Sequence, residues 1–218
     1  MLKKLDLGNS PFLGVFCRAS EDLVIIPPSA PERFADEVGQ ALDAHVVRTS
    51  IDSTELAGSL VCMNSRCALV SRLAHDREIG HLGGFVKIRR VPYRLNAVGN
   101  NILVNDRGAV VHPGYDDTAL EFIAEEMEVE VVRGTIAGMG TVGSSAAVTN
   151  RGAICHPKAS EEEMAVLKAV LGVPVTISTA NYGSGLLGAC MIANSKGAVV
   201  GSTTTPIELG RIEEGLGL

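Results

Sequence analysis

Gly138 to Gly143 form the pattern G-x-G-x-x-G, which cradles a pyrophosphate in dinucleotide-binding proteins. In those proteins a strand precedes the glycines and a helix begins at them, so that the helix N-terminus faces the phosphates. Here the residues that follow, Ser144–Thr149, are small and β-branched, which is typical of a strand. The pattern therefore predicts a glycine-rich junction rather than a nucleotide site, and no P-loop motif occurs in the chain.

Histidine and cysteine are the next candidates for chemistry. His112-Pro113 and His156-Pro157 stand at matching places in two similar segments, and such duplication favours a role in the scaffold over catalysis. His45, His75 and His81 have no Cys or Glu partner at metal-ligand spacing, so neither a metal nor another cofactor is expected.

The odd number of cysteines and the lack of a C-x-x-C pair are typical of reduced thiols in a cytoplasmic protein. A role as small, buried apolar side chains is favoured over a role as a reactive thiolate. The cysteines are Cys17, Cys62, Cys67, Cys155 and Cys190.

One basic cluster stands out, formed by Lys87, Arg89, Arg90 and Arg94. Charged side chains along a strand protect its edge, and contact with phosphate is the alternative. The net charge of −6 argues against a surface that coats nucleic acid. No apolar run is long enough to span a membrane, and no signal peptide is recognised at the N-terminus, so a cytoplasmic protein is expected.

These residues must be positioned by a repeated unit. The segment VNDRGAVVHP (104–113) returns as VTNRGAICHP (148–157), ANSKGAVVGS (193–202), MNSRCALVSR (63–72) and, most faintly, ASEDLVIIPP (19–28). The residue before the glycine, or the residue at the same position in the two copies without a glycine, serves as the anchor. The anchors lie 41 to 45 residues apart, a period typical of a ring or a solenoid. They are Asp22, Arg66, Arg107, Arg151 and Lys196.

Each copy predicts a β-β-α-β unit. In the fourth, strands are expected over 142–149, 153–156 and 173–178, around a helix opened by a Ser160–Glu163 capping box and ended by Gly172. Similar boxes are expected at Ser29–Glu32, Thr118–Glu121 and Thr205–Glu208. The fifth copy lacks a third strand, and 3–7 precedes the first copy without a partner, so we expect the N-terminal segment to close a ring. The expected single domain spans 1–218, with units at roughly 9–52, 53–96, 97–138, 139–181 and 182–218 and an N-terminal strand within 1–8.

Each unit opens with a small polar or glycine-rich turn. Units related by rotation present such turns on one face of the molecule. A purely connecting role is favoured for these turns, and a docking surface for a partner is the alternative. The candidate binding residues are Asn9, Gly58, Ser59, Gly99, Asn100, Asn101, Gly143, Ser144, Gly183 and Ser184.

Several long motifs in order resemble the translation initiation factor 6 family in its short archaeal form. They are NDRGAVVHP, KIRRVPYRLNAVGNN, TNRGAICHPKAS and NYGSGLLGACMIAN. The resemblance implies a pentein fold, an α+β propeller of five β-β-α-β units around a pseudo-five-fold axis. It implies binding to the large ribosomal subunit, through a ribosomal protein and the sarcin-ricin region of its RNA, so that the small subunit cannot join. A monomer that a GTPase or other release factor removes is expected, with a further role in maturation of the large subunit.

The resemblance also bears on single residues. Gly99-Asn100 matches the Gly-Asn motif of the family, which makes Asn100 the first candidate for subunit binding. Some eukaryotic members carry an arginine where Ser59 stands, so a charge contact is not expected there.

Two rival functions remain. Pentein enzymes that modify guanidines use one Cys, one His and acidic residues in the central channel. No such constellation breaks the repeat here, since Cys190 is followed by apolar residues and no histidine follows His156. The other rival is an interaction ring for a different partner, because a fold does not fix a function.

Overall fold

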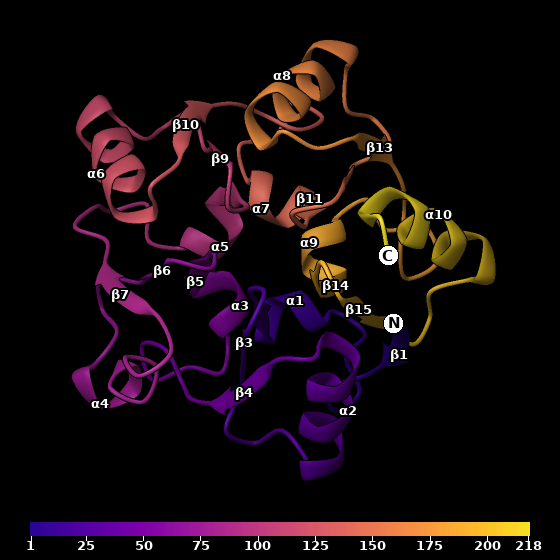
Figure 1. Cartoon of the computed structure of the whole chain (residues 1–218), viewed down its shortest axis with the longest axis horizontal. Helices are drawn as coiled ribbons and strands as arrows, with labels where there is room; N and C mark the ends of the chain where they lie inside the picture. The colour runs from indigo at the N-terminus through magenta and orange to yellow at the C-terminus, as the bar shows by residue number, and fades with distance from the viewer.

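The computed structural model describes residues 1–218 and contains five similar units around a common middle (Figure 1). Each unit has a one-turn helix, a two-stranded hairpin, a second helix and an outer strand. The first consists of α1 (Leu13–Phe16), β2 (Arg18–Ala19), β3 (Leu23–Ile26), α2 (Glu32–Leu42) and β4 (His45–Arg48). The second consists of α3 (Ala57–Leu60), β5 (Val61–Met63), β6 (Cys67–Val70), α4 (Asp76–Ile79) and β7 (Lys87–Arg90).

The third and fourth units follow the same order, and the fifth follows it as far as the second helix. The third consists of α5 (Val98–Asn101), β8 (Ile102–Val104), β9 (Gly108–Val111), α6 (Asp117–Met127) and β10 (Glu130–Arg133). The fourth consists of α7 (Val142–Ser145), β11 (Ala146–Val148), β12 (Ala153–Cys155), α8 (Glu161–Leu171) and β13 (Val175–Ile177). The fifth consists of α9 (Leu187–Cys190), β14 (Met191–Asn194), β15 (Gly197–Gly201) and α10 (Pro206–Leu216).

The strands form five separate three-stranded sheets. In each sheet the hairpin strands are antiparallel, and the third strand lies parallel to the middle one. In the first four units this third strand follows the second helix, as in a β-α-β crossover. The fifth sheet takes its third strand from the N-terminus. There β1 (Leu2–Leu5) pairs in parallel with β15, with Leu2 opposite Ala198 and Leu5 opposite Gly201. The last unit therefore obtains the strand that its own sequence lacks.

The strand predicted over 142–149 is wrong in its first half, because the one-turn helix α7 precedes β11. A one-turn helix opens every unit, and neighbouring one-turn helices pack together in a cycle. The cause is a glycine on each. A Cβ atom there would come within 3.0 Å of a backbone oxygen on the neighbouring one-turn helix. These glycines are Gly14, Gly58, Gly99, Gly143 and Gly188.

The helix starts were predicted with mixed success. The capping boxes Ser160–Glu163 and Thr205–Glu208 are confirmed, as is Gly172 in the left-handed conformation at the end of α8. The box Ser29–Glu32 is wrong, because α2 begins after Pro31 and the Ser29 hydroxyl donates to Glu55 instead.

The third predicted helix start, the box Thr118–Glu121, is wrong as well. Asp116 takes the cap position of α6, where its carboxylate accepts a hydrogen bond from the Ala119 amide. An aspartate is as good a cap as a threonine, so the sequence offered two starts a few residues apart.

Buried side chains collect at the junctions between units. One cluster joins Val24 and Val38 of the first unit to Ile192 and Val199 of the fifth. The eleven-residue helices and α4 lie at the outer rim, and the one-turn helices that open the units lie towards the middle (Figure 1). None of the helices combines the length and apolar character that crossing a membrane would need.

Candidate functional site

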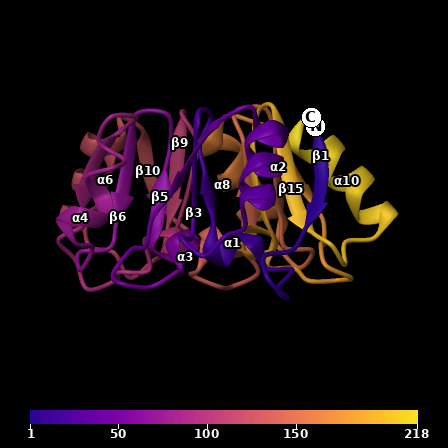
Figure 2. The same ribbon diagram turned by 90° about the horizontal axis from the view of Figure 1, so that it is seen from below.

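The molecule has two different ends. Seen from the side, the strands run through its thickness, and α1 and α3 lie along one edge (Figure 2). Because each one-turn helix precedes the first strand of its hairpin, the hairpin turns lie at the opposite edge. We call these the short-helix end and the hairpin end.

At the hairpin end, the last three residues before the second strand bind the next unit. In the third unit, the Asn105 side chain donates to the carbonyl of Leu171, which ends α8. The Asp106 amide donates to Asn150, and the Arg107 guanidinium donates to the carbonyl of Gly172. Asn64, Thr149 and Asn194 likewise donate to the last carbonyls of α6, α10 and α2. The side chains of the repeated motif thus cap the neighbouring helix.

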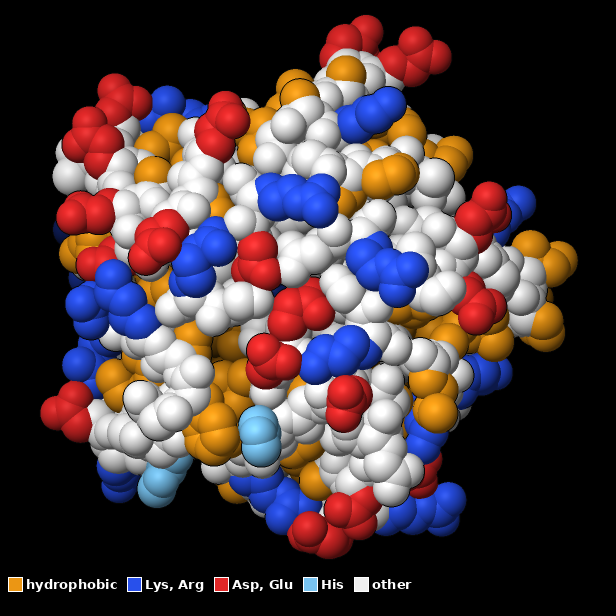
Figure 3. Space-filling model, viewed as in Figure 1, with side chains coloured by type: hydrophobic (Ala, Val, Ile, Leu, Met, Phe, Trp, Pro, Cys, Tyr) orange, Lys and Arg blue, Asp and Glu red, His pale blue; other side chains and the backbone are white.

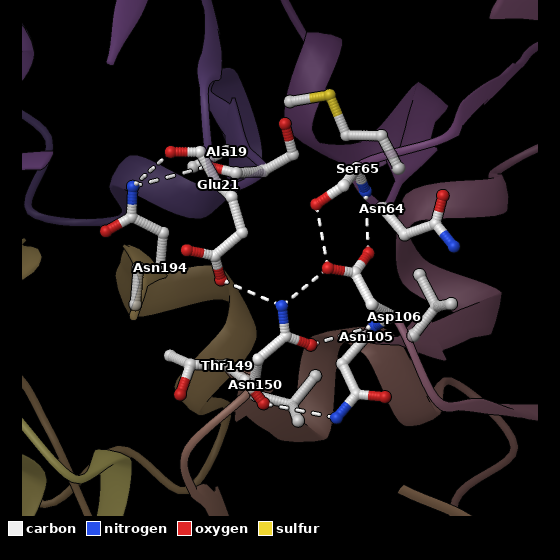
Figure 4. Close-up of a pocket in the computed structure, with 14 residues that line it drawn as sticks. Ala19, Glu21, Asn64, Ser65, Asn105, Asp106, Thr149, Asn150 and Asn194 are labelled. Atoms are coloured by element: carbon white, nitrogen blue, oxygen red, sulfur yellow. Dashed lines mark hydrogen bonds between the residues drawn. The ribbon is translucent and has the colours of Figure 1, made fainter. Parts of the chain in front are cut away.

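Polar side chains also meet one another in the middle of this end (Figure 4). Asp106 accepts hydrogen bonds from Ser65 and Asn150, and Glu21 accepts from Asn150 and Ser195. Burial raises the pKa of Asp106, but the hydrogen bonds from Ser65 and Asn150 outweigh it, and the pKa is lowered. The remaining cavity holds only about 30 Å³. The same face carries Asp and Glu side chains near its middle with Lys and Arg around them (Figure 3). Its central polar groups are largely occupied by one another.

Buried or partly buried carboxylates fix the loops that lead into three units. Glu163, at the start of α8, accepts hydrogen bonds from the Thr135 hydroxyl and from the amides of Ala137 and Gly138. Burial alone would raise the pKa of Glu163, but these donors and the Ser160 amide lower it to about 2. Glu78 has the same role and a pKa of about 2, and Glu208 has the same role in the fifth unit. The carboxylates hold a tight loop in which Ala137 adopts a positive φ of 53°.

The short-helix end carries exposed apolar side chains. Phe12, Leu56 and Leu186 stand immediately before α1, α3 and α9, at one repeat position, and are 39%, 40% and 39% exposed. Tyr182, in the loop that leads into the fifth unit, is 83% exposed. Exposed apolar groups that share one face are typical of a surface that binds protein.

Part of the predicted set forms an equivalent group on this end. Ser59, Asn100 and Ser144 follow the contact glycines of α3, α5 and α7 and are partly exposed. Gly58, Gly99 and Gly143 are buried in the contacts between units, and Asn101 is buried. Of these seven residues, only the three partly exposed ones can touch a partner through their side chains.

The predicted equivalence fails in the first and fifth units. Asn9, Gly183 and Ser184 lie in the loops that precede α1 and α9, five residues before the true counterparts, Gly14 and Gly188. The prediction placed the turns in these loops because the loops contain N-S and G-S pairs like those of the other units. They still lie at the short-helix end, and the Gly183 amide donates to Glu208.

The glycine pattern 138–143 has a structural cause. Contrary to the prediction, a helix does begin at Val142, but it has a single turn, and Gly143 packs on the backbone of Gly99. A Cβ on Gly140 would lie within 3.0 Å of the His112 imidazole, and His156 packs on Gly185 in the same way. The duplicated histidines therefore fill the same place at two junctions.

The four residues of the basic cluster differ in their contacts. Lys87 and Arg89 form ion pairs with Glu126 at 2.7 and 3.0 Å, and Arg90 pairs with Asp76. Hydrogen bonding from Lys87 is the main reason that the pKa of Glu126 is lowered. Three of the four cations lie on the edge strand β7, which favours edge protection, while Arg94 is exposed and has no ion pair.

The cysteine side chains are all buried. Burial raises the pKa of Cys17 and Cys67 to about 12 and that of Cys62 and Cys155 to about 11. A neutral thiol is a poor nucleophile, so these groups act as small core side chains.

Comparison with known proteins decides the family. The eIF-6 family model matches residues 2–215. The chain belongs to the eIF-6 family. It is 43% identical over 217 residues to translation initiation factor 6 of Methanosarcina mazei, covering 100% of this chain and 99% of the relative. The identity is 42% to the factors of Methanoculleus marisnigri, over 217 residues, and Methanococcoides burtonii, over 216, each over at least 99% of both chains. Relatives of the eIF-6 family are thus named as translation factors and not as enzymes.

Sequence reasoning missed Phe12, Leu56 and Leu186. The repeat contained the signal, because all three stand two residues before a contact glycine. An alignment on Gly14, Gly58 and Gly188 would have placed them together.

Proposed function

We propose that this protein binds the large ribosomal subunit and sterically prevents the small subunit from joining it. Family membership supports a role in translation. The observation that carries the proposal is the short-helix end, which combines an apolar group, Phe12, Leu56, Tyr182 and Leu186, with the polar side chains of Ser59, Asn100 and Ser144. Apolar anchors with polar groups between them are typical of specific protein interfaces.

The proposed partners are a ribosomal protein and RNA of the sarcin-ricin region. A net charge of −6 favours docking on a basic ribosomal protein, and the unpaired Arg94 in the loop before α5 is available for a phosphate. A standard interface of about 1,600 Å² would support stable binding. The protein would act as a monomer in the cytoplasm, and a release factor such as a GTPase would remove it.

The proposed mechanism requires that the protein be rigid, because it could not exclude the small subunit sterically if it deformed. The finer fold that we propose is a pentein, a β/α-propeller that the N-terminal strand closes. The pairing of β1 with β15 and the cycle of glycine contacts support it.

The test is co-sedimentation with separated large and small subunits, followed by addition of the missing subunit. We expect the protein to pellet with the large subunit only and to lower the yield of joined particles. Asn100→Ala and the double variant Phe12→Asp, Leu186→Asp should weaken binding by about tenfold or more.

Val166→Asp is the matched control, since Val166 is equally exposed but lies on α8 at the rim. It should bind as the wild type does. If the protein stayed in the supernatant with both subunits, the proposal would be wrong. An assay of citrulline release from arginine analogues would then test the enzyme alternative.

A further inference from the structure

A second cavity lies in the middle of the molecule, beside the polar cluster of the hairpin end. Residues of all five units line it, and about 50 Å³ is free. Ten of the twelve lining residues are hydrophobic. The two cavities share Ala19, Met63, Val104, Val148 and Ala193, so they are successive sections of one central channel. This section contains no Asp, Glu or His in its lining.

The one charged group in this lining is Arg18. It stands four residues before the anchor Asp22, and the repeat gives it four counterparts. They are Cys62, Leu103, Ala147 and Ile192. An apolar or thiol side chain thus occupies this position in four units and a guanidinium in one. A single charge that breaks the repeat inside an apolar channel has no role in the shared scaffold.

No group of the protein neutralises Arg18. It forms no ion pair, and its guanidinium donates to no oxygen atom of the chain. Its neighbour is the Cys62 thiol, whose pKa burial raises to about 11 even though Arg18 lowers it, so the thiol remains neutral at pH 7. Arg18 is partly exposed. A guanidinium cannot lose its proton in a protein, so its positive charge persists there without a counter-charge from the chain.

We propose that the central channel binds a small inorganic anion of halide size on the Arg18 guanidinium. The free volume suits a small ion, because a single water molecule needs only about 10–15 Å³ of free space. A free volume of about 50 Å³ therefore accepts a halide with a few waters. The five N–H donors of the guanidinium supply the contacts, and the apolar wall strengthens the electrostatic attraction.

Anomalous diffraction at the bromine edge tests the site directly. Crystals of the full chain grown with sodium bromide should show a peak between the Arg18 guanidinium and the inner strands. Arg18→Met, which places an apolar side chain there as in the other units, should show none. A map of the wild-type protein without a peak in the channel overturns the proposal, whatever the variant does.

Thermal unfolding gives a second measurement in solution. Sodium bromide is compared with sodium gluconate at equal ionic strength, because gluconate is a much larger anion than bromide. At about ten times the dissociation constant, bromide should raise the wild-type midpoint by about 3 to 6 °C relative to Arg18→Met in the same pair of salts.

Two further variants keep that result interpretable. Arg18→Lys keeps a positive charge and should keep a bromide response. Arg211→Met removes an exposed arginine without an ion pair and should respond as the wild type does. An equal response in the wild type and Arg18→Met would overturn the proposal.

Discussion

The contact glycines are set by sterics at the scale of single atoms. A Cβ on Gly143 would overlap the carbonyl oxygen of Gly99, and backbone cannot move aside as a side chain can. We predict that Gly143→Ala lowers the free energy of unfolding by about 3 kcal/mol, measured by urea denaturation. Gly210→Ala is the control, because nothing lies within 4 Å of that site in α10, and it should stabilise the protein by about 0.5–1 kcal/mol. Equal effects of the two substitutions would contradict this account.

A second prediction at the residue scale concerns Glu163. Its folded pKa of about 2 lies below the ordinary value of 4.5 for a glutamate, so protonation favours the unfolded chain and the stabilisation is lost as the pH falls. Glu163→Gln should lower the free energy of unfolding by about 1–3 kcal/mol above pH 5, and the difference should shrink towards pH 2. Unfolding measured at several pH values checks this. The exposed neighbour Glu161 provides the control, since Glu161→Gln should leave the pH profile unchanged. If the free-energy difference between the wild type and Glu163→Gln were the same at every pH, the charge of Glu163 would not contribute to stability.

Among the elements, the hairpin turns act as helix caps for their neighbours. Asn105 donates to the carbonyls of Leu171 and Thr149 and accepts from the amides of Arg107 and Gly108. We predict that Asn105→Asp destabilises the protein more than Asn105→Thr, because a carboxylate has no proton to donate and would face two carbonyls. Threonine already occupies the equivalent position at Thr149, where it donates to Leu216. Thermal unfolding should show a loss of about 2–4 kcal/mol for the aspartate variant and about half as much for threonine. The reverse order would show that charge at this position is tolerated.

The elements that sequence reasoning found are those whose signals are local. The helix α8 carries its capping box and its terminal glycine within a few residues, so its bounds were predictable. The one-turn helix α7 has no such signal, because packing of Gly143 on the neighbouring unit holds it. Single turns are marginal without tertiary contacts, and propensity does not reveal them. The docking residues were predicted only in part for the same reason, because the signal that aligns them is a contact between units. Ser59, Asn100 and Ser144 were placed together, but the loops at Asn9 and Gly183 resembled the turns in composition and not in position.

On the scale of the whole molecule, the junction between the first and second units differs from the other four. At the hairpin end, Asn64, Asn105, Thr149 and Asn194 each bind the following unit, whereas the equivalent Ser20 donates only to Leu23 of its own hairpin. The helix α4 ends at Ile79 after four residues, so no helix end reaches this place. A hollow of about 220 Å³ remains there between Ser20, His45 and Phe85, on the face shown in Figure 3. The hairpins β2–β3 and β5–β6 are therefore each bonded to a neighbour on one side only.

This asymmetry predicts where the molecule opens first. Hydrogen exchange under native conditions reports the free energy of local opening, and a difference of about 1.4 kcal/mol is tenfold in rate. The amides of β3 (Leu23–Ile26) and β6 (Cys67–Val70) should exchange about tenfold faster than those of β9 and β12, whose hairpins are bonded on both sides. The four strands have the same middle position in their sheets, so sheet geometry alone predicts no difference. Faster exchange in β15, which pairs with the N-terminal strand, would instead place the weak point where the chain ends meet. Equal protection in all five middle strands would mean that the glycine contacts at the short-helix end couple the units regardless of what the hairpin turns do.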